Sequence, residues 1–125
     1  MSGITFDAGG LIALERNDRR VIAILVTARD DGGQIHVPAT VLAQVIRNPA
    51  KQVRLWRMIQ HESTKVVPLD GSGAQAIGIL LAQTGTTDIV DAHVVVCART
   101  RGHTVITSDP FDLKRLDPSL KMIAV

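Results

Sequence analysis

Short apolar segments alternate with longer stretches of helical periodicity from one end of the sequence to the other. The segments with the length of strands are Gly3–Phe6, Ile35–Val37, Lys65–Val67, Thr104–Thr107 and Met122–Val125. The stretches with helical periodicity are one through Leu11, Ile12 and Leu14, then Arg19–Arg29, Ala39–Arg47, Lys51–Gln60, Gly71–Gln83, Asp88–Arg101 and Pro110–Leu116. Strands that are apolar throughout and alternate with helices are typical of a parallel sheet covered on both faces. We therefore predict one α/β domain over residues 1–125, with a central parallel sheet flanked by helices.

The composition limits the kinds of partner that the chain can have. Of its 125 residues 46% are hydrophobic, which is enough for a single core. The only aromatic residues are Phe6, Trp56 and Phe111, so RNA binding by stacking on an aromatic platform is disfavoured. The formal net charge of +2 permits a phosphate-rich partner without requiring one.

The cysteine content and the lack of targeting signals bear on the compartment. Cys97 is the single cysteine, which excludes an internal disulfide and a thiolate-rich zinc site. Its neighbours are apolar, so we expect it to be buried. The sequence has no apolar run long enough to span a bilayer and no signal-peptide pattern at its N-terminus. We expect a cytoplasmic protein that does not associate with a membrane.

Four aspartates stand where ligands bind in open parallel sheets, beyond the carboxyl ends of the strands. Asp7 directly follows the first strand, and Asp109 follows the strand Thr104–Thr107. Asp88 and Asp91 begin the helix before that strand, three positions apart and therefore on one face. Clustered carboxylates repel one another unless a cation lies between them. Mg²⁺ or Mn²⁺, which prefer oxygen ligands, would remove that repulsion.

Each aspartate also has a purely structural interpretation. Asp7, Asp88 and Asp109 all precede helices and are suited to cap them, and Pro110 after Asp109 strengthens that interpretation. Asp91 is different because it begins a very apolar stretch, where an unpaired charge is costly. For Asp91 the sequence favours a ligand over a cap.

These residues resemble the motifs of a known family. The pieces are GITFDA at residues 3–8, VP at 37–38 with VLAQV at 41–45, DIVDAHV at 88–94 and ITSDP at 106–110. Their order resembles a PIN domain, and is most similar to the VapC toxins of bacterial toxin–antitoxin pairs. The resemblance covers essentially the whole chain.

The resemblance implies a function and a set of site residues. It makes Asp7, Asp91 and Asp109 the metal-binding and catalytic acids, with Ser108 as a supporting polar residue. It implies a homodimeric endoribonuclease that depends on Mg²⁺ or Mn²⁺ and cleaves tRNA or rRNA. It also implies inhibition by a small VapB-like antitoxin.

The sequence departs from the family pattern at Gln44, where the family ordinarily has a glutamate. A neutral amide can coordinate a cation through its oxygen but adds no charge. Our interpretation is that Asp88 restores the missing charge and joins the metal ligands. The alternative is a catalytically weak or inactive PIN fold that binds RNA or an antitoxin.

Other residues allow two interpretations each. Arg16, Arg47 and Lys51 are suited to contact an RNA backbone, or belong to an ordinary solvated surface. Trp56 is either a core residue or part of an apolar groove for an antitoxin helix. His93, two positions from Asp91, is expected to be a core histidine with its hydrogen bonds satisfied. A phosphoacceptor receiver domain, another fold with acids at the sheet edge, is disfavoured because Pro68 follows the third strand.

Overall fold

A five-stranded sheet forms the centre of the protein. The computed structural model describes residues 3–125. The strands are β1 (Gly3–Phe6), β2 (Gln34–Pro38), β3 (Thr64–Val67), β4 (Thr104–Thr107) and β5 (Met122–Ala124). All neighbouring strands pair in parallel, in the order β3-β2-β1-β4-β5. The predicted parallel α/β fold is confirmed.

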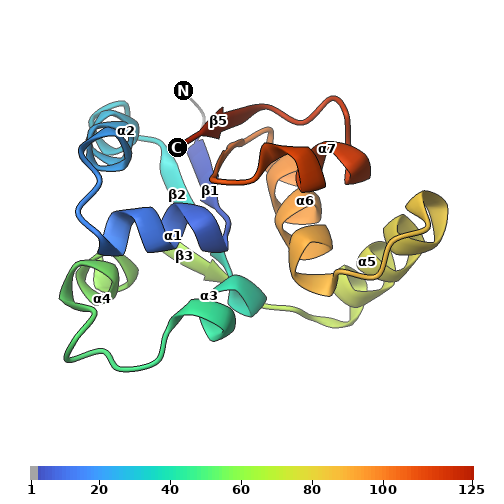
Figure 1. The fold of residues 1–125 in the computed structure, drawn as a ribbon, viewed down its shortest axis with the longest axis horizontal. Coiled ribbons are helices and arrows are strands. Elements are labelled where there is room, and N and C mark those ends of the chain that lie inside the picture. The colour runs from blue at the N-terminus through green and yellow to red at the C-terminus, as the bar shows by residue number, and fades with distance from the viewer. Residues whose placement is uncertain (1–2) are drawn as a thin grey trace.

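Helices cover both faces of this sheet. The helices are α1 (Ala8–Glu15), α2 (Arg19–Asp30), α3 (Ala39–Val45), α4 (Val53–Gln60), α5 (Gly71–Thr84), α6 (Ile89–Arg101) and α7 (Pro110–Leu116). Helices α1, α2 and α4 lie on one side, whereas α6 and α7 lie on the other (Figure 1). Helix α5 packs on α6 and extends away from the sheet (Figure 1). In the described part of the chain, no helix is long and apolar enough to cross a membrane.

The strand order places a topological switch between β1 and β4. From β1 the chain builds outward through β2 to β3, and then returns to the other side of β1 to form β4 and β5. Right-handed crossovers require the helices to change faces at that reversal. The carboxyl ends of β1 and β4 are therefore adjacent and open onto a crevice, where ligands bind in such sheets.

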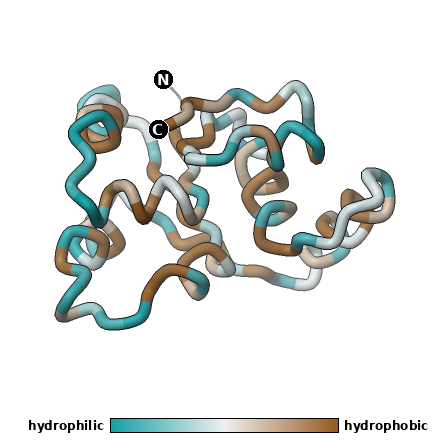
Figure 2. The backbone as a smooth tube through the Cα atoms, viewed as in Figure 1, coloured by the Kyte–Doolittle hydropathy of each residue, from teal (hydrophilic) through white to brown (hydrophobic). Residues whose placement is uncertain are grey.

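The core is aliphatic, as the composition requires. Fully buried strand residues such as Ile4, Ile35 and Ile106 belong to one core cluster, and α1 and α6 both pack on the sheet. Helix α6 buries Ala92 and Val94 among others, and Cys97 is buried as predicted. Hydrophilic residues gather in the loop after α3, and hydrophobic ones along α3 and α6 (Figure 2).

Two helix boundaries differ from the prediction by two residues, and the others by one residue at most. Helix α3 ends at Val45, not at Arg47, and α4 begins at Val53, not at Lys51. The end of α3 is explained by Gln52, a buried side chain whose Oε1 accepts hydrogen bonds from the amides of Arg47 (2.8 Å) and Asn48 (3.0 Å). Its amide nitrogen also donates to the Val45 carbonyl at 3.0 Å. The Gln52 side chain thus bonds to backbone groups that would otherwise form the next turn of α3.

Two glycines let α1 approach β4 closely. A Cβ built on Gly10 would clash with the Ile106 carbonyl oxygen, and one built on Gly9 would clash with the Ser108 side chain. Only glycine fits where the two backbones come this near. The start of α1 consequently rests directly on the end of β4.

Candidate metal centre

Asp7 lies at the carboxyl end of β1 and caps α1. Its side chain is 7% exposed, and Oδ1 accepts a hydrogen bond from the Gly10 amide at 2.8 Å. Burial raises the pKa of this carboxyl, and the negative charge of Asp109 raises it further. Hydrogen bonds from Thr107 and from the Gly10 amide act in the opposite direction. The cap therefore fixes one oxygen of a carboxylate that is costly to ionise.

Thr107 joins Asp7 to Asp109, and the sequence interpretation missed it. Its buried hydroxyl oxygen accepts a hydrogen bond from the Asp109 amide at 2.9 Å, and its hydroxyl group bonds to the Asp7 carboxylate. The Asp109 side chain makes no capping bond to α7, although Asp109 stands at the capping position. The cap interpretation of Asp109 is thus wrong, and its exposed carboxylate interacts instead with Asp112.

Asp88 and Asp91 begin α6. Asp88 is exposed and caps the helix, since its Oδ1 accepts from the Asp91 amide at 2.9 Å. The partly buried Asp91 carboxylate has no hydrogen bond or ion pair with any described residue. Burial raises its pKa to about 6, and the charges of Asp88, Asp112, Asp7 and Asp109 add to that effect. Asp91 is therefore a carboxylate without a counter-charge, surrounded by four others.

Asp112, on the first turn of α7, is a fifth acid that the sequence interpretation did not place in the site. Its pKa is raised, first by a hydrogen bond with Asp109 and then by the charge of that residue. Asp112 follows Asp109 by three positions at a helix start, and that spacing was the signal that could have found it.

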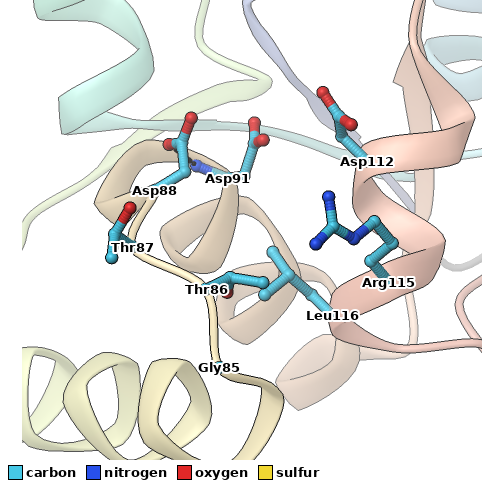
Figure 3. A pocket seen from close by; sticks show the side chains of 8 residues that line it. All are labelled: Gly85, Thr86, Thr87, Asp88, Asp91, Asp112, Arg115 and Leu116. Carbon is cyan, nitrogen blue, oxygen red and sulfur yellow. Dashed lines mark hydrogen bonds between the residues drawn. The ribbon is translucent and has the colours of Figure 1, made fainter.

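A cleft of about 310 Å³ opens between α6 and α7. It is lined by Gly85, Thr86, Thr87, Asp88, Asp91, Asp112, Arg115 and Leu116. Asp88 and Asp91 project from the start of α6, and Asp112 and Arg115 face them from α7 (Figure 3). Asp7 and Asp109 act on Asp91 through their charge but do not line this cleft.

The donor set suits a hard divalent cation. It consists of carboxylate oxygens, the ligands that Mg²⁺ and Mn²⁺ prefer, and their mutual repulsion would be relieved by positive charge. As the side chains stand, residues 3–125 hold no group of three or more His, Cys, Asp or Glu side chains close enough to bind one ion. The acids surround a common region without forming a closed coordination shell.

The two predicted supporting residues lie apart from this cluster. Ser108 is exposed and sits against Gly9, lining a second hollow together with Arg16. Gln44 is exposed on α3, and its side chain makes no hydrogen bond within the described residues. The structure therefore brings Asp7, Asp88, Asp91 and Asp109 together, but joins neither supporting residue to them by a hydrogen bond.

The predicted basic residues lie outside the acidic cleft. Arg47 donates from Nη1 to the carbonyls of Ala43 (2.8 Å) and Ile46 (2.7 Å), so it caps the end of α3. Lys51 lines a separate hollow beside α4. Their proposed contacts with RNA remain predictions.

The exposure of Trp56 and the burial of His93 bear on the interpretations that the sequence allowed for them. Trp56 is 41% exposed, so the core interpretation is wrong and the groove interpretation remains a prediction. His93 is buried, and its Nδ1 lies 2.7 Å from the hydroxyl of Thr40. The prediction of a satisfied core histidine is confirmed.

Solved structures share this fold. The chain of VapBC2 from Rickettsia felis, bound to a DNA fragment from its promoter, superposes with a TM-score of 0.75 at 16% identity, covering 98% of each chain. FitAcB from Neisseria gonorrhoeae gives 0.61 at 17% identity, covering 96% of each chain. FitAB bound to an IR36 DNA fragment gives 0.64 at 17% identity, covering 97% of this chain and 94% of the other.

The family follows from the sequence itself. No curated protein matches the chain. The PIN domain family matches residues 4–117, a span that includes β2, β3, β4, all but the first residue of β1, and all five clustered aspartates. With a parallel sheet, acids at the β1–β4 switch and this match over most of its length, the chain belongs to the PIN domain family.

Proposed function

We propose that the protein is a Mg²⁺- or Mn²⁺-dependent endoribonuclease and the toxin of a toxin–antitoxin pair. The observation that carries the proposal is Asp91, a partly buried carboxylate with a raised pKa and no partner among the described residues. A stable fold gains nothing from such a group, whereas a bound cation would supply its missing counter-charge. The membership of the PIN family supports nuclease chemistry.

The acids of the cluster have two tasks in this proposal. Asp7, Asp91 and Asp109 hold the cation, and Asp88 contributes the charge that Gln44 lacks. Thr107 links the Asp7 carboxylate to the Asp109 backbone amide through its two hydrogen bonds. A cation held there would supply Lewis-acid activation of a water molecule and positive charge to offset the charge that develops on the phosphodiester. Leu116 and the 85–87 loop form the remaining walls of the cleft.

Cleavage of RNA by the purified protein tests the proposal. We expect activity with Mn²⁺ or Mg²⁺, its loss on chelation, and its loss in Asp109→Asn. Expression alone should arrest bacterial growth, and Asp7→Asn should not, although asparagine caps α1 nearly as well as aspartate. If both proteins arrest growth equally, the toxicity does not come from this site.

The alternative is a PIN fold that binds RNA or an antitoxin without cleavage. The observation in its favour is Gln44, exposed and without a hydrogen-bond partner in residues 3–125. Metal-dependent binding without strand scission, in the same assay, would support it.

The partner that we propose is a short VapB-like antitoxin segment, apolar on one side and acidic on the other. A hollow of about 310 Å³ beside α2 and α4 has apolar walls that include Leu25 and Met58, and Arg29, Arg54 and Arg57 also line it. Apolar floors with basic rims suit such a segment. VapBC2 and FitAB, which share this fold, are each named as bound to a DNA fragment.

A charge reversal tests the antitoxin contact. With the antitoxin coexpressed, Arg57→Glu should restore growth arrest because the acidic segment no longer docks. Nuclease activity of the isolated variant should be retained.

We also propose that the protein is a homodimer, that it acts on tRNA or rRNA, and that Arg16 and Lys51 contact that RNA. Sedimentation and RNA footprinting test these points.

A further inference from the structure

Arg115 is the one basic side chain in the lining of the acidic cleft. It stands three positions after Asp112 on α7, so both side chains project from one helix face. Its guanidinium group projects into the cleft toward the start of α6, opposite Asp88 and Asp91 (Figure 3).

The guanidinium group of Arg115 is not paired with the described acids around it. Within residues 3–125, Arg115 makes no hydrogen bond and no ion pair within 4.0 Å. It still acts on the cluster from a distance, since its charge lowers the pKa of Asp112. An arginine facing several carboxylates would ordinarily pair with one of them in a bidentate contact. Here its five donors remain available to another anion.

We propose that Arg115 binds a phosphate group of the RNA strand that enters the cleft, an inference that rests on the proposed function. A polyanion approaching Asp88, Asp91 and Asp112 is repelled, and among the described residues that line the cleft Arg115 alone has a positively charged side chain. The planar guanidinium matches two phosphate oxygens at once, which an ammonium group cannot do. Arg115 thus binds substrate, while the acids hold the cation.

Lys114, the preceding residue, offers a matched control. It is exposed on the same helix but is not part of the cleft lining. If general positive charge on α7 attracted RNA, loss of either residue would weaken binding equally. A specific contact in the cleft requires Arg115 alone.

The first experiment measures binding without cleavage. A fluorescent single-stranded RNA oligonucleotide is titrated in Mg²⁺ with Asp91→Asn protein that also carries Arg115→Ala, Arg115→Lys or Lys114→Ala. We expect about tenfold weaker binding for Arg115→Ala, in the range of a lost charged hydrogen bond. The slope of log affinity against log salt should fall by about 0.7, the value for one phosphate contact on a single strand. Arg115→Lys should recover part of the affinity, and Lys114→Ala should change it less than twofold.

The second experiment separates substrate binding from cation binding. In otherwise unaltered protein, Arg115→Ala should raise KM for RNA cleavage about tenfold with a smaller change in kcat. It should bind Mn²⁺ at least as tightly as the parent, because removing a positive charge cannot weaken a cation site. Weaker Mn²⁺ binding would overturn the proposal by making Arg115 a support of the acids.

The outcomes also distinguish this inference from the proposed function. Cleavage by the parent with unchanged KM and salt slope in Arg115→Ala would refute the role of Arg115 alone. Binding that depends on Arg115, in a parent that cleaves no RNA, would refute the nuclease and keep the phosphate contact. Binding and cleavage both absent from the parent would refute both.

Discussion

Replacing Asp91 with asparagine should stabilise the protein when no cation is present. The pKa of Asp91 rises from 3.8 to about 6 because of burial and four neighbouring acids. A rise of that size corresponds to about 3 kcal/mol of unfavourable ionisation. Partial exposure to solvent reduces this, and we expect a gain of about 1–2 kcal/mol. For a domain of this size the melting temperature should increase by about 3–8 °C.

The stability gained by Asp91→Asn should depend on pH in a direction that follows from the raised pKa of Asp91. A carboxyl whose pKa is raised by folding binds its proton more tightly in the native state, so ionisation costs stability as pH rises. The gain from Asp91→Asn should therefore be absent below about pH 4, grow between pH 4 and 6, and be complete at pH 7.5. Because the helix cap of Asp88 is to the backbone amide of residue 91, the substitution leaves that bond in place.

Thermal melts with EDTA and with Mn²⁺ provide the assay. In the parent, saturating Mn²⁺ should raise the melting temperature, and in Asp91→Asn most of that increment should disappear. Asp31→Asn, an exposed acid at the end of α2, is the control and should change neither value appreciably. An Asp91→Asn protein that melts below the parent at pH 7.5 in EDTA would refute the reasoning.

Three further predictions test the supports of the site. Gln52→Ala should lower the free energy of unfolding in urea by about 2 kcal/mol, because it leaves buried backbone groups without partners; a loss under 0.5 kcal/mol would contradict this. Gly9→Ala should destabilise by about 1–3 kcal/mol through its clash with the β4–α7 turn, whereas Gly78→Ala, with open space around it, should stabilise by about 0.5–1 kcal/mol. Asp88→Asn should keep its cap yet lose most of its nuclease activity, and Gln44→Glu should reduce that loss. Full activity of Asp88→Asn at limiting Mn²⁺ would exclude charge compensation.

Much of the fold was predictable because its signals are local. Apolar runs of strand length alternate with helical periodicity, and every predicted strand and helix exists with small changes at its ends. The aspartates at strand ends were found for the same reason. Asp7 and Asp109 each directly follow an apolar run, and parallel strands bring such positions to one edge.

What could not be predicted depends on contacts between distant residues. The end of α3 is set by hydrogen bonds from Gln52. Gln52 lies after α3 in the sequence, inside the segment Lys51–Gln60 that was expected to form the next helix. Thr107 reads as the last residue of an apolar strand, and only the pairing of β1 with β4 brings it to Asp7. In the sequence Arg115 is an ordinary helix residue, and only the placement of α7 opposite α6 brings it to the acids (Figure 3).

The close packing of Gly9 and Gly10 on the end of β4 has a consequence for the order in which the protein becomes active. Two glycines in its first turn make α1 a poor helix on its own, so its form depends on docking against β4. The Asp7 amide also donates to the Ile106 carbonyl at 3.2 Å, across the same junction. The corner that holds Asp7 therefore cannot form until β4 pairs with β1.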